Sequence, residues 1–445
     1  MIARSRFIRP LVAALLVLTV ALAAAGCGGG GGGGGSSASG GAPKAGTLNI
    51  WLAGLFATAT PGTPYRNWVD AQTKRFEAAY PGSKVNITLL PANNDQFSAK
   101  LQAAFTAHQV PDLMLIYSGG YTTPYIPSLL QLNSYIDKSS GMYDSISNWD
   151  LSCADLNCQD GKGQIYGVPI DFGSYALFYN KSLLKKAGVQ PPKTFDDLLS
   201  ACTALKAKSI IPIAYGDRDG YSTDNWVTYM YASYFDSGDV GRLNDGSMKY
   251  SDPKVVDPLQ TLTQLHTQGC VNQDASTREN ASANDYFTSG KAAMVQMYPF
   301  VITQFEKALG KNLGVTEIPT AGDGPLAGRA AGNSFHNWVI PKDAKNPDLA
   351  FAYLKIATDK TAGADLASMV GTPPANIAAQ STVSDPFVKF FAKLGQDPGI
   401  PLVDSVIPVN LALYYYKQLQ AAFSGSETPA KAMANVDSER AQLNP

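Results

Sequence analysis

Thr47-Leu48-Asn49-Ile50-Trp51-Leu52 opens the pattern that decides the fold class. This run and residues 85–89 alternate in part between apolar and polar side chains, so both predict strands. Residues 113–116 are continuously apolar, which is typical of a strand buried on both faces. The two intervening segments, 68–80 and 97–105, carry apolar residues at helical spacing. Strand and helix therefore alternate, and this order predicts an α/β fold with a parallel sheet covered by helices.

The pattern continues through the middle of the chain. Residues 176–179 and 210–214 predict strands, and residues 338–340 predict one more in a final third that is otherwise mostly helical. Thr194 precedes a helical pattern and has Asp197 three residues later, which indicates a near capping box. The part beyond the first 43 residues has about 400 residues, too many for one hydrophobic core, so we expect two lobes.

Residues 1–26 predict a signal peptide. Three arginines at 4, 6 and 9 precede an apolar stretch over 11–25, which has signal-peptide length and is short for a bilayer span. Ala23-Ala24-Ala25-Gly26-Cys27 is similar to the lipobox of bacterial lipoproteins, although Ala24 stands where leucine is usual. We therefore expect lipidation of Cys27, with a plain secretory signal as the alternative.

The segment after Cys27 supports a tether. Residues 28–35 are eight consecutive glycines, followed by serine, alanine and glycine, and such a run behaves as flexible coil. We expect residues 27–46 to be a lipidated cysteine and a flexible linker that hold the protein at the outer face of the cell membrane. Nothing else in the sequence predicts a membrane span.

The charge balance excludes one class of partner. Removal of the signal peptide leaves 32 basic and 36 acidic residues, a net charge of −4. This mildly acidic composition predicts no basic patch for nucleic acid.

Four cysteines remain after Cys27. In an exported chain Cys153, Cys158, Cys202 and Cys270 suggest two disulfides, for which three pairings are possible. We favour Cys153–Cys158, a short local loop, together with Cys202–Cys270. A zinc site is the alternative, but a paired C-x-x-C spacing is missing.

A set of motifs then occurs in the order of a known family. The most specific are Tyr166-Gly167-Val168-Pro169, Leu177-Phe178-Tyr179-Asn180-Lys181, Ala187-Gly188-Val189 and the segment PPKTFDDL at 191–198, in which phenylalanine replaces the usual tryptophan and aspartate the usual glutamate. Further matches are F-x-x-x-Y-P-G-x-x-V at 76–85, Pro111-Asp112, FTSGKAAM at 287–294 and WVIPK at 338–342. The chain resembles the extracellular solute-binding proteins of ABC importers, in the group of maltose-binding and other sugar-binding lipoproteins.

The resemblance implies a two-lobe fold of the periplasmic-binding-protein type (type II), with a hinged cleft between the lobes. We expect the first lobe at 47–171 plus 333–378 and the second at 172–332 plus 379–445. The implied function is capture of a sugar or oligosaccharide by cleft closure and delivery to a membrane permease. The implied protein is a monomer that needs no cofactor.

A sugar site needs carboxylates and amides for the hydroxyls and aromatic planes for the flat C–H face. Carrying the family's cleft positions over to this sequence gives Asn94, Asp95, Tyr117, Ser118, Tyr121, Asp171, Ser174, Asp217, Asn225, Trp226, Tyr298, Phe300, Asn333, Phe335, His336 and Tyr414.

Structural roles are the alternative for several of these residues. Tyr117 and Tyr298 could cap strand ends, Asp217 could cap a turn, and Trp226 could be a core residue. His336 could be a buried histidine with satisfied hydrogen bonds. Helical geometry points residues 414–416 in different directions, so at most one or two of these three tyrosines can reach the cleft.

Other functions leave weaker signals. A glycoside hydrolase needs two carboxylates that flank a bond, and no local motif pairs them. The G-x-S-x-G elbow is absent, and the three histidines lack metal-ligand spacing, so we expect neither catalysis nor a metal site. Residues 217–224 are only faintly similar to a calcium loop. A non-sugar solute, such as a peptide or polyamine, stays open.

Overall fold

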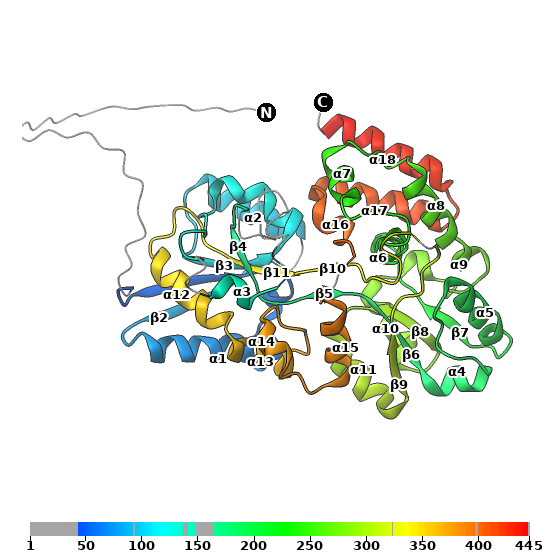
Figure 1. Ribbon diagram of the computed structural model, residues 1–445, viewed down its shortest axis with the longest axis horizontal. Helices are drawn as coiled ribbons and strands as arrows, with labels where there is room; N and C mark the ends of the chain where they lie inside the picture. Colours follow the sequence, from blue (N-terminus) through cyan, green and yellow to red (C-terminus); the bar gives the residue numbers. More distant parts are fainter. Residues whose placement is uncertain are drawn as a thin grey trace, which may run out of the picture. The chain divides into compact units, whose positions relative to one another are not determined.

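The computed structural model describes residues 43–91, 94–136, 141–147, 149, 163–322, 324–396 and 399–443, without the side chains of Asn94 and Asp95. Their strands form two separate sheets joined through one short strand pair (Figure 1). Cys27, Cys153 and Cys158 lie outside these ranges. Within them, none of the helices combines the length and apolar character needed to cross a bilayer.

The first sheet has the strand order β2-β1-β3-β11-β4. Its strands are β1 Thr47–Leu52, β2 Lys84–Leu89, β3 Leu113–Tyr117, β4 Gly167–Pro169 and β11 His336–Val339. The helices of this first lobe are α1 Pro64–Ala79, α2 Asn94–Thr106, α3 Met142–Ser145, α12 Pro347–Ala357, α13 Lys360–Met369 and α14 Ile377–Gln380. Trp68, Leu113 and Trp338 belong to its buried core.

The first sheet is only partly parallel. Strand β1 pairs in parallel with β2 and β3, as the alternation of strands and helices predicts. Strand β11 runs antiparallel to both β3 and β4, so the expectation of a parallel sheet is wrong at this edge. The physical reason is that β11 enters the sheet after the chain returns from the other lobe, not through a local strand–helix–strand crossover.

The second sheet has the order β7-β8-β6-β9. Its strands are β6 Ala176–Asn180, β7 Ile211–Ala214, β8 Ala292–Met297 and β9 Leu313–Thr316. The helices of this second lobe are α4 Lys181–Ala187, α5 Phe195–Lys206, α6 Tyr221–Tyr231, α7 Asp239–Asp245, α8 Pro253–Leu262, α9 Gln264–Thr267, α10 Asn280–Thr288, α11 Ile302–Leu309, α15 Pro386–Leu394, α16 Val403–Val406, α17 Val409–Phe423 and α18 Pro429–Leu443.

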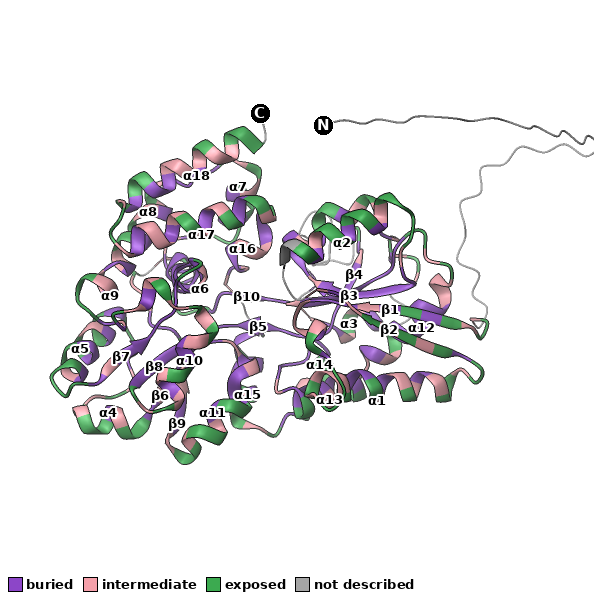
Figure 2. Cartoon of the chain, turned by 180° about the vertical axis from the view of Figure 1, so that it is seen from behind, coloured by how far each residue is buried: buried purple, intermediate pink, exposed green. Residues whose placement is uncertain are grey.

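A second core fills this lobe. Phe178, Trp226 and Phe391 belong to one buried cluster that the elements of the second sheet share. Figure 2 shows that most strands are buried in both sheets, whereas helices such as α4 and α18 expose residues on their outer sides. Two sheets with separate cores confirm the predicted α/β fold class. The exact lobe boundaries stay a prediction.

Two of the segments that connect the lobes are strands. Strand β5, Gly173–Ser174, pairs antiparallel with β10, Gly332–Asn333, and Figure 1 shows the pair between the two sheets. One strand leads from the first sheet to the second and the other leads back. The segments that flank this pair therefore belong to both lobes, and they carry several of the residues expected at the cleft.

A disulfide joins Cys202 in α5 to Cys270, which follows α9, with a Cα–Cα distance of 5.4 Å. This is the pairing that the sequence favoured.

The same helix α5 begins with the capping box expected there, because Thr194 Oγ1 accepts a hydrogen bond from Asp197 N and the Asp197 carboxylate accepts one from Thr194 N.

Candidate functional site

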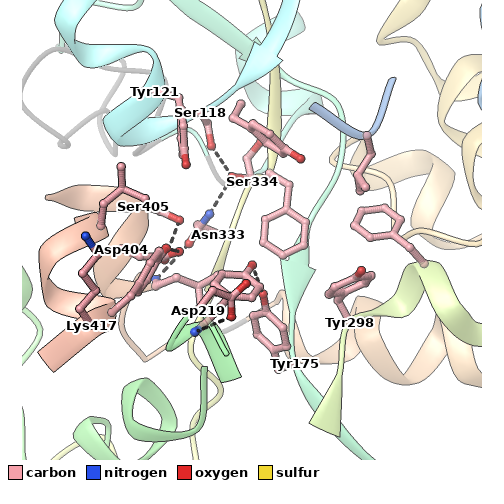
Figure 3. A pocket seen from close by; sticks show the side chains of 18 of the residues that line it. Ser118, Tyr121, Tyr175, Asp219, Tyr298, Asn333, Ser334, Asp404, Ser405 and Lys417 are labelled. Carbon is pink, nitrogen blue, oxygen red and sulfur yellow. Dashed lines mark hydrogen bonds between the residues drawn. The ribbon is translucent and has the colours of Figure 1, made fainter. Parts of the chain in front are cut away.

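A cavity of about 750 Å³ is lined by residues of both lobes (Figure 3). Its aromatic lining residues are Tyr117, Tyr121, Tyr175, Tyr221, Tyr298, Phe300, Phe335 and Tyr416. Its polar lining residues are Ser118, Arg218, Asp219, Asn333, Ser334, Asp404, Ser405 and Lys417. Leu55, Leu402 and Leu413 complete it. Both the volume and this mixture of rings and polar groups fit a small-molecule site.

The first lobe contributes the end of β3 and the 3₁₀ helix η2, Gly119–Tyr121. The ring of Tyr117 stacks on the ring of His336 with centroids 5.0 Å apart, and it contacts Tyr121 at 5.4 Å. Burial raises the pKa of the Tyr117 phenol, so this hydroxyl stays protonated and can donate a hydrogen bond. The backbone N–H of Ser118 donates to the Phe335 carbonyl at 3.0 Å, which fixes the loop against the strand that follows β10.

A row of rings forms one side of the pocket. Tyr298 and Phe300, which follow β8, have centroids 5.4 Å apart. Tyr175 lies 6.0 Å from Tyr298, and Phe335 lies 5.8 Å from Phe300. These separations are in the range of favourable aromatic pairs, so the rings hold one another in place. The row offers a preformed apolar surface.

Polar groups occupy the other side. Figure 3 shows Asp404, Ser405 and Lys417 across the pocket from Tyr298. The Tyr416 hydroxyl donates to Asp404 Oδ2 at 2.7 Å, and the Ser405 hydroxyl donates to Asp404 Oδ1 at 3.3 Å. Burial raises the pKa of the Asp404 carboxyl. This side therefore has oriented oxygen atoms that can accept hydrogen bonds from a solute or donate them to it.

Two further tyrosines and one arginine in an ion pair belong to the part of the lining that the second lobe contributes. The hydroxyls of Tyr175 and Tyr221 are 2.5 Å apart, and burial raises the pKa of both phenols. Arg218 forms an ion pair with Glu279, so its charge is already compensated. Arg218 and Lys417 are the basic residues of the lining, and both are exposed.

Seven of the expected site residues line this pocket. They are Tyr117, Ser118, Tyr121, Tyr298, Phe300, Asn333 and Phe335. The side chain of Asn333 is already engaged, since Oδ1 accepts from Leu402 N at 3.0 Å and Nδ2 donates to the Ser334 carbonyl at 2.7 Å. Direct contact of these seven residues with a solute stays a prediction.

Asp171 and His336 do not line the pocket, in contrast to the expectation. Both side chains are fully buried. The Asp171 carboxylate accepts from the backbone N–H of Phe335 at 3.0 Å and of His336 at 2.9 Å, and its second oxygen lies 2.6 Å from His336 Nδ1. The pair instead ties together two of the segments that cross between the lobes, and the His336 ring stacks on the Tyr117 ring.

Ser174 and Asp217 are also placed differently from the expectation. Ser174 is buried, and its hydroxyl bonds to the Tyr229 hydroxyl and to the Ala331 carbonyl. The Asp217 carboxylate accepts hydrogen bonds from Thr223 N at 2.9 Å and from Thr223 Oγ1 at 2.7 Å, in the first turn of helix α6, whose N-cap is Gly220. Satisfying backbone groups at a hinge strand and a helix start accounts for both residues.

Three residues on helices miss the lining because of their helical register. Asn225 and Trp226 point into the interior of the second lobe, where α6 is buried. Tyr414 is absent from the lining, whereas Leu413, Tyr416 and Lys417 of the same helix α17 line the pocket. Successive residues of a helix point about 100° apart, so Tyr416 takes the place expected for Tyr414. The side chains of Asn94 and Asp95 lie outside the described part of the structure.

Several lining residues carry weak sequence signals. Tyr175 and Tyr221 are close neighbours of expected residues, and Tyr416 belongs to the expected tyrosine run. Asp404 and Ser405 have no local motif, because they reach the pocket on the one-turn helix α16. Among the described residues, no group of histidine, cysteine and acidic side chains could hold a metal ion.

Known proteins share this architecture. A solved chitin oligosaccharide binding protein has a TM-score of 0.76 at 20% identity, covering 89% of this chain and 98% of that chain. This likeness shows the two-lobe fold. A Brucella abortus protein named as a putative binding protein is 26% identical over 306 residues, or 68% of this chain and 71% of its own. The sn-glycerol-3-phosphate-binding periplasmic protein of Escherichia coli is 22% identical over 405 residues, or 82% and 86%.

The family model described as bacterial extracellular solute-binding protein matches residues 71–392. This match spans well over half of the chain, including both sheets except β1. The chain belongs to the family of bacterial extracellular solute-binding proteins.

Proposed function

We propose that this protein captures a sugar or an oligosaccharide in the pocket and delivers it to the permease of an ABC importer. The observation that carries the proposal is the division of the pocket into a row of rings around Tyr298 and a polar side around Asp404. A sugar ring has an apolar C–H face that suits the rings, and hydroxyls at its edge that suit the carboxylate and phenol groups. The similar proteins named for chitin oligosaccharide and glycerol phosphate support a hydroxyl-rich solute.

A thermal-shift screen against mono- and oligosaccharides tests the solute class. A ligand at 100 times its dissociation constant should stabilise the folded protein by about 2.7 kcal/mol. Peptides, polyamines and glycerol phosphate belong in the same screen. A clear shift with one of these, and none with any carbohydrate, would refute the sugar proposal.

Two variants with a matched control test the site itself. Tyr298→Ala removes a ring from the apolar side and should weaken the best carbohydrate by roughly tenfold, since one stacking ring contributes about 1 kcal/mol or more. Tyr416→Phe removes only the hydroxyl that bonds to Asp404 and should weaken binding roughly fivefold. Tyr414→Phe, on the same helix but outside the lining, is the control and should bind as the wild type does. Titration calorimetry measures all three, and equal loss in the control would contradict the site.

The site is proposed to bind without catalysis. The carboxylates of the lining are Asp219 and Asp404, and Asp404 is already hydrogen-bonded by Tyr416 and Ser405. Chromatography of oligosaccharides after prolonged incubation should therefore find the substrates unchanged. Cleavage products that vanish in Asp404→Asn would instead indicate a hydrolase.

We further propose that the mature chain begins at a lipidated Cys27 and acts as a monomer at the outer face of the cell membrane. The lipobox-like sequence and the glycine run support this location. Mass spectrometry of the mature N-terminal peptide should find a diacylglyceryl cysteine. Light scattering of the soluble form that starts after Cys27 should give the mass of one chain.

A further inference from the structure

The lobes meet beside the pocket at a glycine. Helix η2 of the first lobe lies against α16 of the second lobe, and Gly120 of η2 is buried at this contact. A Cβ atom built on Gly120 would lie 2.6 Å from the Ile407 carbonyl oxygen, and 3.6 Å and 3.7 Å from those of Ser405 and Asp404. The first distance is well inside van der Waals contact, so a side chain cannot fit there in this arrangement.

The restriction comes from the opposite lobe and not from the backbone of Gly120 itself. Its neighbour Gly119 has a φ of +60°, a conformation that favours glycine, whereas Gly120 is not among the residues with positive φ. An L-residue can therefore adopt the backbone of position 120. What excludes a side chain is the carbonyl of Ile407, and that carbonyl is near only while η2 and α16 are in contact.

The contact also positions the pocket. The segment that Gly120 touches carries Asp404 and Ser405 of the second lobe. Helix η2 ends at Tyr121 and directly follows Tyr117 and Ser118, and these three residues belong to the first lobe's part of the lining. Bringing η2 onto α16 thus brings the polar groups of the two lobes to one cavity. A second contact lies at Phe300, which packs against the core of the first lobe with its ring 6.5 Å from that of Tyr65. A phenylalanine side chain can rotate to adapt, but a backbone carbonyl cannot.

We propose that Gly120 is a positioning residue for solute binding: its missing side chain is what allows the first lobe to close onto α16 around the solute. The inference rests on the proposed function, because it concerns closure of the same pocket. It adds a specific point of contact at which closure can be blocked without replacing any side chain that lines the pocket.

The test uses two substitutions and a matched glycine. Gly120→Ala and Gly120→Leu add side chains of increasing size at the contact. Gly238→Ala is the control, because Gly238 also lacks positive φ and an added Cβ meets nothing within 4 Å. Small-angle X-ray scattering of each protein is recorded without solute and with saturating maltotriose or chitotriose, and calorimetry gives the affinities.

We expect Gly120→Ala to weaken the bound trisaccharide by tenfold or more, and Gly120→Leu to lose the decrease in radius of gyration that the wild type shows. The thermal midpoint without solute should stay close to that of the wild type, since the clash is relieved when the lobes part. A purely structural role would lower this midpoint and leave closure intact. Gly238→Ala should close and bind normally.

The two proposals fail in different ways. If neither trisaccharide nor any other carbohydrate binds the wild type, the sugar proposal fails. The scattering curves without solute then test whether a side chain at position 120 keeps the lobes apart. A Gly120→Leu protein more expanded than the wild type supports the inference. Scattering curves of wild type and Gly120→Leu that coincide in every condition would overturn it.

Discussion

Three carboxyl groups of the second lobe have raised pKa values. Burial raises the pKa of Asp217 to about 7, and it also raises the pKa values of Asp224 and Asp404. A carboxyl whose pKa is higher in the folded than in the unfolded chain binds protons preferentially in the folded state. Its contribution to the free energy of unfolding is therefore largest at low pH and is lost as the pH rises through the folded value.

Replacing Asp217 by asparagine should remove one such contribution. Asparagine cannot ionise, but its carbonyl oxygen can still accept the hydrogen bond from Thr223 N. Between about pH 4 and pH 7 the wild type should lose stability relative to Asp217→Asn, by up to about 4 kcal/mol, because the pKa of Asp217 rises from the ordinary aspartate value to about 7 on folding. Urea unfolding at several pH values measures the difference. The exposed Asp285→Asn is the control, and parallel profiles for all three proteins would contradict the assignment.

Asp171 distinguishes a structural carboxylate from one that binds solute. Removing its side chain leaves the backbone N–H groups of Phe335 and His336 without their acceptor in a buried place. We expect Asp171→Ala to lower the free energy of unfolding without solute by about 3 kcal/mol or more. A residue that only contacts solute would leave this free energy unchanged, as we expect for Tyr298→Ala. Chemical denaturation of both variants makes the comparison.

At the scale of single elements, helix α5 shows how much a short motif determines. The helix is closed at its start by the reciprocal hydrogen bonds of Thr194 and Asp197, each 3.1 Å long. Thr194→Ala should cost about 1 kcal/mol of stability, the usual effect of losing an N-cap. Thr203→Ala, an exposed threonine on the same helix, should change stability by less than about 0.5 kcal/mol. Equal effects would show that the cap contributes nothing specific.

The sequence predicts elements well where the apolar pattern of a segment is clear. Residues 47–52 and 113–116 become β1 and β3 almost to the residue, because their apolar patterns reflect the burial of each strand. Strands β4, β5 and β10 have only two or three residues, which is too short for a periodic signal. Strand β11 is antiparallel to its neighbours because the chain enters it from the second lobe, and the residues of β11 themselves give no signal of this direction.

The site is harder to predict because it depends on register. Ser174 and Tyr175 are adjacent, yet Tyr175 lines the pocket while the hydroxyl of Ser174 is bonded in the interior. A resemblance locates the segment, but a shift of one residue on a strand reverses the face. Asp404 could not be found at all from local sequence. It lines the pocket only because α16 packs beside α6 and η2.

At the scale of the whole molecule, the Cys202–Cys270 disulfide ties distant parts of the second lobe together. It closes a separation of 68 residues, for which the chain-entropy estimate gives about 4 kcal/mol of stabilisation. The double variant Cys202→Ala/Cys270→Ala should lose about this much stability in thermal or urea unfolding. Neither cysteine lines the pocket, so affinity for solute should be retained below the lowered midpoint. A large loss of affinity with unchanged stability would contradict the purely stabilising role that we assign to the disulfide.

The position of β11 has a consequence for synthesis of the chain. This strand lies between β3 and β4 in the first sheet, yet the ribosome makes it only after the whole second sheet. Until residue 339 has emerged, β3 keeps an open edge of unpaired backbone groups, the kind of edge that invites pairing with another chain. The sheet whose first strands are translated first is therefore completed last. A nascent chain that stops short of β11 should aggregate or be degraded, even though it contains every strand of the second lobe.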